Sequence, residues 1–90
     1  MVTKYNETIY HQQRINGRWH TVDKDDMGDN HTYENIALAT CHDTIKFFRR
    51  MGSKQQIRTG VTVDGREFTK IFSYSPTDKN YRNVLVFLEI

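Results

Sequence analysis

Residues 8–22 read TIYHQQRINGRWHTV, and we expect this stretch to set the fold. Asn16-Gly17 lies near its middle, and an Asn-Gly pair is a strong hairpin signal because a type I′ turn needs positive φ at both central residues. The expected cross-strand pairs are Ile15–Arg18, Arg14–Trp19 and Gln13–His20. Neither face of this hairpin is cleanly apolar, so we predict that it forms an exposed edge of a sheet.

A second hairpin is predicted from about Gln55 to Tyr74, around a second type I′ signal at Asp64-Gly65. Pairing outward from that turn places one set of side chains on an apolar face: Ile57, Val61, Val63, Phe68, Phe72 and Tyr74. The opposite, polar face is expected to carry Arg58, Thr62, Glu67, Thr69 and Ser73. Gly60 predicts a bulge or a close approach of the backbone to a neighbour.

The segment between the hairpins predicts an acidic loop from Asp23 to His31 and then a helix from about Tyr33 to Met51. The helix has a wide apolar arc that includes Cys41, Phe47 and Met51 and is expected to be buried, and Gly52 suits the position just past its C-terminus. Cys41 is therefore interpreted as a core residue.

The C-terminal strand, from Tyr81 to Ile90, follows a turn over residues 75–80 and is apolar on both faces, which favours a central position. The chain is thus predicted to be a single α+β domain spanning residues 1–90, in the order ββαβββ. Its sheet is expected to be mostly antiparallel, with about five strands and one helix (about 33–51) packed on one face.

Composition narrows the class of protein. The 90 residues carry a net charge of +2 and include five Phe, five Tyr, one Trp and one Cys. Aromatic side chains give a small chain enough core to fold. A lone cysteine and the lack of a long apolar stretch favour a cytoplasmic protein with no membrane association. The composition is typical of small phage or mobile-element proteins, for which the compartment would be the host cytoplasm.

Chemical motifs are few. Residues 23–34 match most of an EF-hand calcium loop, but Met27 offers no side-chain oxygen and a strand precedes the segment. The histidines are scattered, so no metal site and no cofactor are predicted. No catalytic motif is present, so no enzyme is predicted. A weaker alternative is a metal-dependent hydrolase or nuclease that uses His20, His42, Asp25 and Asp26.

The leading hypothesis is a non-enzymatic binding protein that occupies a macromolecular partner, most simply a protein, as an inhibitor or regulator. Large rings and Arg are frequent energetic centres of interfaces. The expected contact surface is the first hairpin, through Tyr10, Arg14, Arg18, Trp19 and His20. If the basic faces of the chain are instead only solvated, Arg14 is expected to lie over Trp19 as a cross-strand cation–π pair.

The alternative is an RNA or single-stranded DNA binder, because basic groups bind phosphates while exposed rings stack on bases. Its predicted contacts are His42, Lys46, Arg49, Arg50, Lys54 and Arg58. The apolar C-terminal strand also predicts that a homodimer can form, which would cover one face of the sheet.

Overall fold

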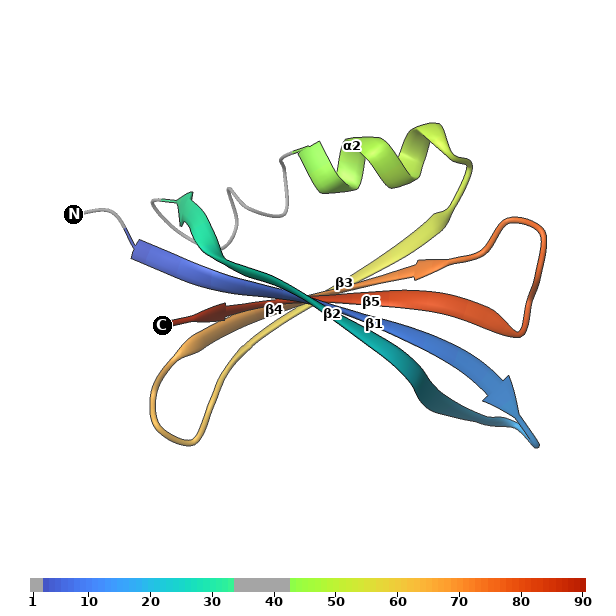
Figure 1. Ribbon diagram of the computed structural model, residues 1–90, viewed down its shortest axis with the longest axis horizontal. Coiled ribbons are helices and arrows are strands. Elements are labelled where there is room, and N and C mark those ends of the chain that lie inside the picture. The colour runs from blue at the N-terminus through green and yellow to red at the C-terminus, as the bar shows by residue number, and fades with distance from the viewer. Residues whose placement is uncertain (1–2, 34–42) are drawn as a thin grey trace.

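The computed structural model of the 90-residue chain describes residues 3–33 and 43–90. Their elements, in chain order, are β1 (Thr3–Ile15), β2 (Arg18–Tyr33), α2 (Asp43–Arg50), β3 (Lys54–Val61), β4 (Glu67–Tyr74) and β5 (Tyr81–Glu89). The five strands form one sheet in the order β2-β1-β5-β4-β3, and every neighbouring pair is antiparallel. Figure 1 shows a strongly twisted sheet with α2 on one side, and no described element lies over the other side.

The predicted α+β class is wrong. The described residues form an all-β, antiparallel five-stranded sheet, and their single helical segment, α2, is only eight residues long. The number of strands and their antiparallel pairing are confirmed. The predicted central position of the C-terminal strand is also confirmed, because β5 lies between β1 and β4.

The helix prediction fails at its start, because Tyr33 is the last residue of β2. Residues 34–42 of the expected helix, Cys41 among them, lie outside the described residues. At the other end Gly52 has a φ of 80°, as expected just past a helix C-terminus. Phe47 and Met51, expected in the buried arc, are 58% and 61% exposed. Within the described residues, α2 lies close mainly to β3, which leaves Phe47 and Met51 largely uncovered.

The predicted acidic loop, Asp23 to His31, is also wrong, because these residues belong to the long edge strand β2. Two features let an acidic segment pair with β1. The segment follows the edge of the sheet, where exposed charged side chains are tolerated. The pairing also shifts register on both sides of Gly28, which forms a β-bulge. Its φ of 85° lies in a region that residues other than glycine rarely adopt.

The first hairpin is confirmed in detail. Asn16 and Gly17 have φ values of 52° and 77°, as a type I′ turn requires. The three predicted cross-strand pairs are all present: Ile15–Arg18, Arg14–Trp19 and Gln13–His20. Within this hairpin, however, only β2 lies at an edge of the sheet, because β1 pairs with β5 on its other side.

The register of the second hairpin is wrong by one residue. Val61 pairs with Glu67, so a wider loop replaces the two-residue turn. Hydrogen bonds across this loop explain its width: the Thr62 amide donates to the Arg66 carbonyl at 2.8 Å, and the Arg66 amide donates to Thr62 Oγ1 at 3.0 Å. Asp64 contacts both of these residues through its side chain.

This shift moves the side chains of β3 to the opposite faces relative to β4. Arg58 now shares a face with Phe72, and Ile57 shares a face with Ile71. The predicted separation of an apolar face from a polar face in this hairpin is therefore wrong.

The core lies on the side of the sheet that carries α2, which we call the helix-side face. Its buried cluster consists of Tyr5, Ile71, Leu85 and Phe87, with Ile9 packed against it. The opposite side, the open face, carries the alternate residues of the same strands, including Tyr10, Arg14, Phe68, Phe72, Arg82 and Val86. Central strands that are apolar on both faces, as β5 is, supply both surfaces.

Gly60 provides a test of the packing on the open face. It pairs with Phe68, and a Cβ at Gly60 would lie 2.6 Å from Cζ of that ring. We predict that Gly60→Ala lowers the free energy of unfolding by about 1 kcal/mol, because overpacking displaces the ring. Urea titration measures the loss. Thr59→Ala, at the exposed neighbouring position, is the control and should cost less than about 0.5 kcal/mol. Equal losses in the two variants would contradict this packing.

Candidate functional site

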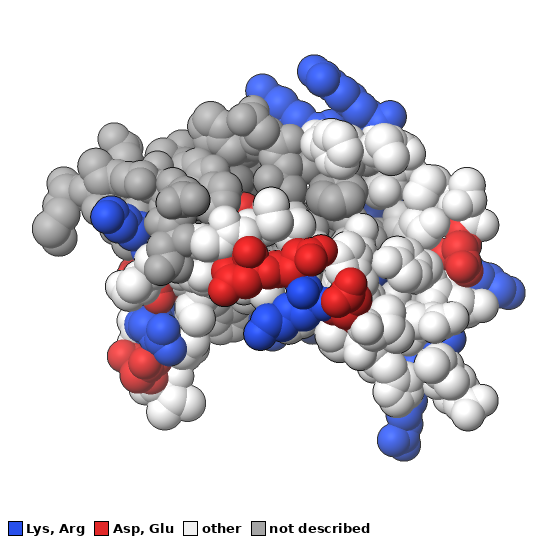
Figure 2. All heavy atoms as spheres, in the orientation of Figure 1, with Lys and Arg blue, Asp and Glu red and all other residues white. Residues whose placement is uncertain are grey.

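The open face is hollowed. Figure 2 shows the recess on the underside of the molecule, opposite α2, between two downward lobes. The recess has a volume of about 570 Å³. Its apolar floor and walls come from β1, β4 and β5: Tyr10, Phe68, Phe72, Val84, Val86 and Leu88. The sheet is strongly twisted, so the tip of the first hairpin and the β3–β4 loop both lie on the side away from α2 (Figure 1). This twist contributes to the concave shape of the open face.

Charge is separated between the two faces by strand register. Among the paired strand residues, the open face carries seven basic residues: Lys4, Arg14, Lys24, Lys54, Arg58, Lys70 and Arg82. The helix-side face carries five acidic residues: Glu7, Asp23, Asp25, Glu67 and Glu89. Each face has one paired charge of the minority sign, Asp26 on the open face and Arg18 on the helix-side face. A net charge of only +2 therefore conceals a strongly basic surface.

Asp26 weakens this basic surface little. It lies on the edge strand β2, away from the central strands. Its carboxylate already accepts hydrogen bonds from the Gly28 amide at 2.9 Å and from Asn6 Nδ2 at 3.2 Å. The hydrogen bond from Gly28, and after it the one from Asn6, lower the pKa of Asp26, so its carboxylate stays ionised and is already engaged by these two donors.

Arg82 lies on the open face near the start of the central strand β5, and three aromatic rings surround its guanidinium. The guanidinium carbon lies 4.3 Å from the ring centroid of Trp19, 4.8 Å from that of Phe72 and 5.8 Å from that of Tyr74. Arg82 Nε also donates to Gln12 Oε1 at 2.8 Å. These contacts join β2, β1, β5 and β4, and they hold a cation on the face in one position.

Two further cations lie beside rings on this face. Lys70 Nζ is 5.5 Å from the centroid of the Phe68 ring, and the Arg58 guanidinium is 5.7 Å from that of Phe72. Both cations are exposed, and both rings are half-buried. Rings and positive charges therefore alternate across the surface instead of forming separate patches.

The predicted hairpin site is divided by the structure. Tyr10, Arg14 and Trp19 lie on the open face, whereas Arg18 and His20 pair with residues of the helix-side face. Tyr10 lines the recess. The predicted stacking partner of Trp19 is replaced, because Arg82 lies over that ring.

The predicted nucleic-acid contacts are divided in the same way. Lys54 and Arg58 are exposed on the open face, on β3. Lys46, Arg49 and Arg50 are exposed on α2, on the opposite side of the sheet (Figure 1). His42 lies outside the described residues.

Sequence reasoning missed residues that organise this surface, above all Arg82 and Phe68. Arg82 begins an apolar strand and gives no local signal, because its ring partners come from β2 and β4. Lys70 and Phe68 alternate along β4, but their relation to Arg58 depends on the register of the β3–β4 pair. A correct loop length would have placed Arg58 beside them.

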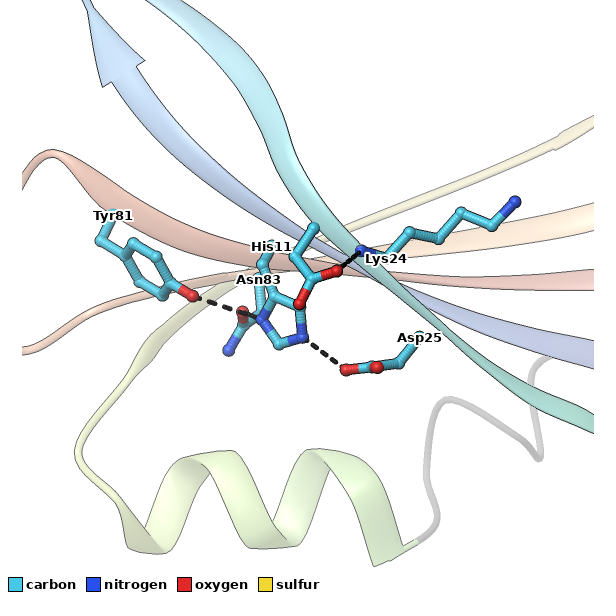
Figure 3. A network of polar contacts seen from close by, with 6 residues as sticks. His11, Lys24, Asp25, Tyr81 and Asn83 are labelled. Atoms are coloured by element: carbon cyan, nitrogen blue, oxygen red, sulfur yellow. Dashed lines mark hydrogen bonds and ion pairs between the residues drawn. The ribbon is translucent and has the colours of Figure 1, made fainter.

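A second polar network lies on the helix-side face, around His11 of β1 (Figure 3). His11 Nε2 is 2.7 Å from Asp25 Oδ2 on β2, and His11 Nδ1 is 2.8 Å from Asn83 Oδ1 on β5. The Tyr81 hydroxyl is 3.3 Å from Nδ1. With acceptors at both nitrogens, the site favours the imidazolium form, in which both nitrogens donate.

The hydrogen bond to Asp25 is the main cause that raises the pKa of His11 above its usual value of 6.5. Partial burial opposes the shift, while Asn83 and the negative charges of Asp25 and Asp23 add to it. With both nitrogens engaged, His11 joins β1 to β2 and β5 and has no free nitrogen to act as a base. The network is therefore a cross-strand tie that depends on pH.

The residues of the hydrolase alternative do not converge. Asp25 and Asp26 pair with Ile9 and Thr8, so they lie on opposite faces of the sheet. Within residues 3–33 and 43–90 there is no cluster of three or more His, Cys, Asp or Glu side chains that could hold a metal ion. The calcium-loop pattern of Asp23 and its neighbours falls in a strand.

Comparisons with known protein families, with curated proteins and with solved structures find no match to this chain. No helix in the described part of the chain is long and apolar enough to cross a membrane. The class of site is therefore defined by geometry alone: a concave, basic and aromatic sheet face.

The Arg82 contacts can be tested through stability. We predict that Arg82→Lys lowers the free energy of unfolding by about 1 kcal/mol, because Lys keeps the charge but loses the planar stacking and the Nε hydrogen bond. Arg18→Lys, at an exposed position on the other face of the hairpin, should change stability by less than about 0.5 kcal/mol. Chemical denaturation compares the two variants. A cost at Arg82 no larger than that at Arg18 would rule out the ring cluster.

The His11 tie predicts a pH dependence. Because its pKa is raised in the folded state, the stabilisation is present below about pH 6.5 and is lost as pH rises through the folded-state value. The free energy of unfolding of the wild type, minus that of His11→Gln, should therefore fall as pH rises above about 6.5, by no more than about 1 kcal/mol. Asp25→Asn should remove most of the same dependence. A wild-type pH profile in Asp25→Asn would contradict the assignment.

Proposed function

We propose that this protein is a non-enzymatic binding protein that occupies a polyanionic macromolecule through the open face of its sheet. The observation that carries the proposal is the separation of charge. Seven basic residues and a single acidic one share that face among the paired strand positions. Such a surface attracts polyanions over the Debye length and speeds their association.

The shape and composition of the open face also support close contact with a partner, beyond the long-range electrostatic attraction. A recess of about 570 Å³ with an apolar floor offers area that is buried on contact. Trp19 and Arg82 are of the residue types that dominate interface energetics, and both are held in place before any partner arrives. A surface that is already ordered loses little side-chain entropy on binding.

The same charges argue against a second copy of this chain as the occupant. A two-fold symmetric dimer through the open face would set cations against cations, and like charges in contact cost several kcal/mol. The predicted homodimer through the outward side of β5 is therefore disfavoured, because Val84, Val86 and Leu88 share their face with Arg82 and Lys70.

A matched pair of triple variants tests the proposal. Lys54→Gln/Arg58→Gln/Lys70→Gln removes three exposed charges from the open face, and Lys46→Gln/Arg49→Gln/Arg50→Gln removes three exposed charges from α2. Both variants have the same net charge. On immobilised heparin, a generic polyanion, we predict that the α2 variant elutes close to the wild type, whereas the open-face variant elutes at clearly lower salt.

Thermal unfolding checks that both triple variants are folded. If the two variants elute together, net charge and not the open face governs retention, and the proposal fails.

A further inference from the structure

We infer that the polyanion is a single-stranded nucleic acid, whose bases stack on the rings of the open face while its phosphates contact the cations beside them. This inference rests on the function proposed above and names its ligand. Heparin and acidic proteins share the negative charge, so the argument for nucleic acid must come from the other chemistry of the face.

The rings are the first argument. Five aromatic residues lie on the open face by register: Tyr10, Trp19, Phe68, Phe72 and Tyr74. All five are half-buried, so each is fixed in place and still reachable. Stacking on a ring suits every base, because every base has a π-face. A polyanion without flat aromatic groups would leave this chemistry unused.

The second argument is the arrangement of rings and charges. On the open side of β4 the sequence of side chains is Phe68, Lys70, Phe72 and Tyr74, with residues of the same face about 6.6 Å apart. Lys70 and Arg58 each lie less than 6 Å from a ring. A single strand of nucleic acid presents bases and phosphates in the same alternation.

The third argument concerns Arg82. Its guanidinium is held in place by the rings of Trp19, Phe72 and Tyr74, and a planar guanidinium fixed in this way can pair with a phosphate. Arg82 lines the same recess as Val84 and Val86, whose apolar side chains can accept the flat face of a base. A double helix keeps its bases stacked internally and would meet this recess only with its backbone.

Fluorescence anisotropy with labelled 12-nucleotide probes tests the inference. The probes are oligouridylate, oligothymidylate and a mixed-sequence duplex of the same length. We expect both single strands to bind more tightly than the duplex, and the ratio between them tells whether RNA or DNA is preferred. Unlabelled poly-glutamate is the competitor that stands for an acidic protein, and it should displace the single strands poorly.

Two kinds of variant separate stacking from charge. Tyr10→Leu and Phe68→Leu keep every charge but remove a ring, so each should weaken single-strand binding at least about fivefold with the same salt dependence. The open-face triple variant should reduce the slope of log affinity against log salt by about 2, or about 0.7 for each lost phosphate contact. The α2 triple variant should match the wild type in both respects.

Failure of the nucleic-acid inference can be distinguished from failure of the proposed function. If heparin retention depends on the open face but neither single strand binds at roughly 50 µM protein, where even weak nonspecific complexes form, the nucleic-acid inference falls and the proposed function stands. Equal binding of duplex and single strand, or no effect of Tyr10→Leu and Phe68→Leu, also overturns the inference. Efficient displacement by poly-glutamate would assign the face to an acidic protein instead.

Discussion

The structure depends on the alternation of side chains along the central strand β5. This strand is hydrogen-bonded to β1 on one side and to β4 on the other, so its register fixes which residues of all three strands share a face. Leu85 and Phe87 point to the core, and Arg82 and Val86 point to the open face. A slip of one residue would expose the core and bury the guanidinium, so the register is strongly specified.

The same alternation produces the proposed binding surface. Successive side chains of a strand point to opposite faces of the sheet. An acidic residue on the helix-side face can therefore be followed directly by a basic residue on the open face. Asp23 on the helix-side face and its neighbour Lys24 on the open face illustrate the pattern. The acidic stretch of β2 then lies at one edge of the sheet and the basic residues of β3 at the other. Charges on both edge strands also oppose edge-to-edge association, which exposed strands otherwise invite.

Local signals in the sequence correctly predict part of this fold. Asn16-Gly17 gave the first hairpin with its register, because the turn needs only two residues with positive φ. The apolar run of residues 84–88 gave the central strand. The second hairpin failed because Asp64-Gly65 resembles the same turn, while side-chain bonds between Thr62, Asp64 and Arg66 enforce a wider loop.

Other errors come from contacts between distant parts of the chain. Residues 23–33 form a strand only because β1 supplies the backbone partners, and their acidic composition favours a loop when considered alone. The prediction of the site residues was incomplete in part for the same reason. Tyr10, Arg14 and Trp19 were recognised from the hairpin, but Arg82 joins them only through the pairing of β5 with β1. That pairing spans most of the chain, and no periodicity of the sequence reveals it.

The central claim is that ligand meets the open face alone, and methyl NMR of β5 tests it most directly. Val84, Val86 and Leu88 carry their methyl groups on the open face, whereas Leu85 and Ile71 lie in the core on the opposite side. During titration with oligouridylate, the account predicts large shift changes for the first three residues and small ones for Leu85 and Ile71. Changes centred on Leu85 and Ile71, or spread equally over both faces, would contradict it.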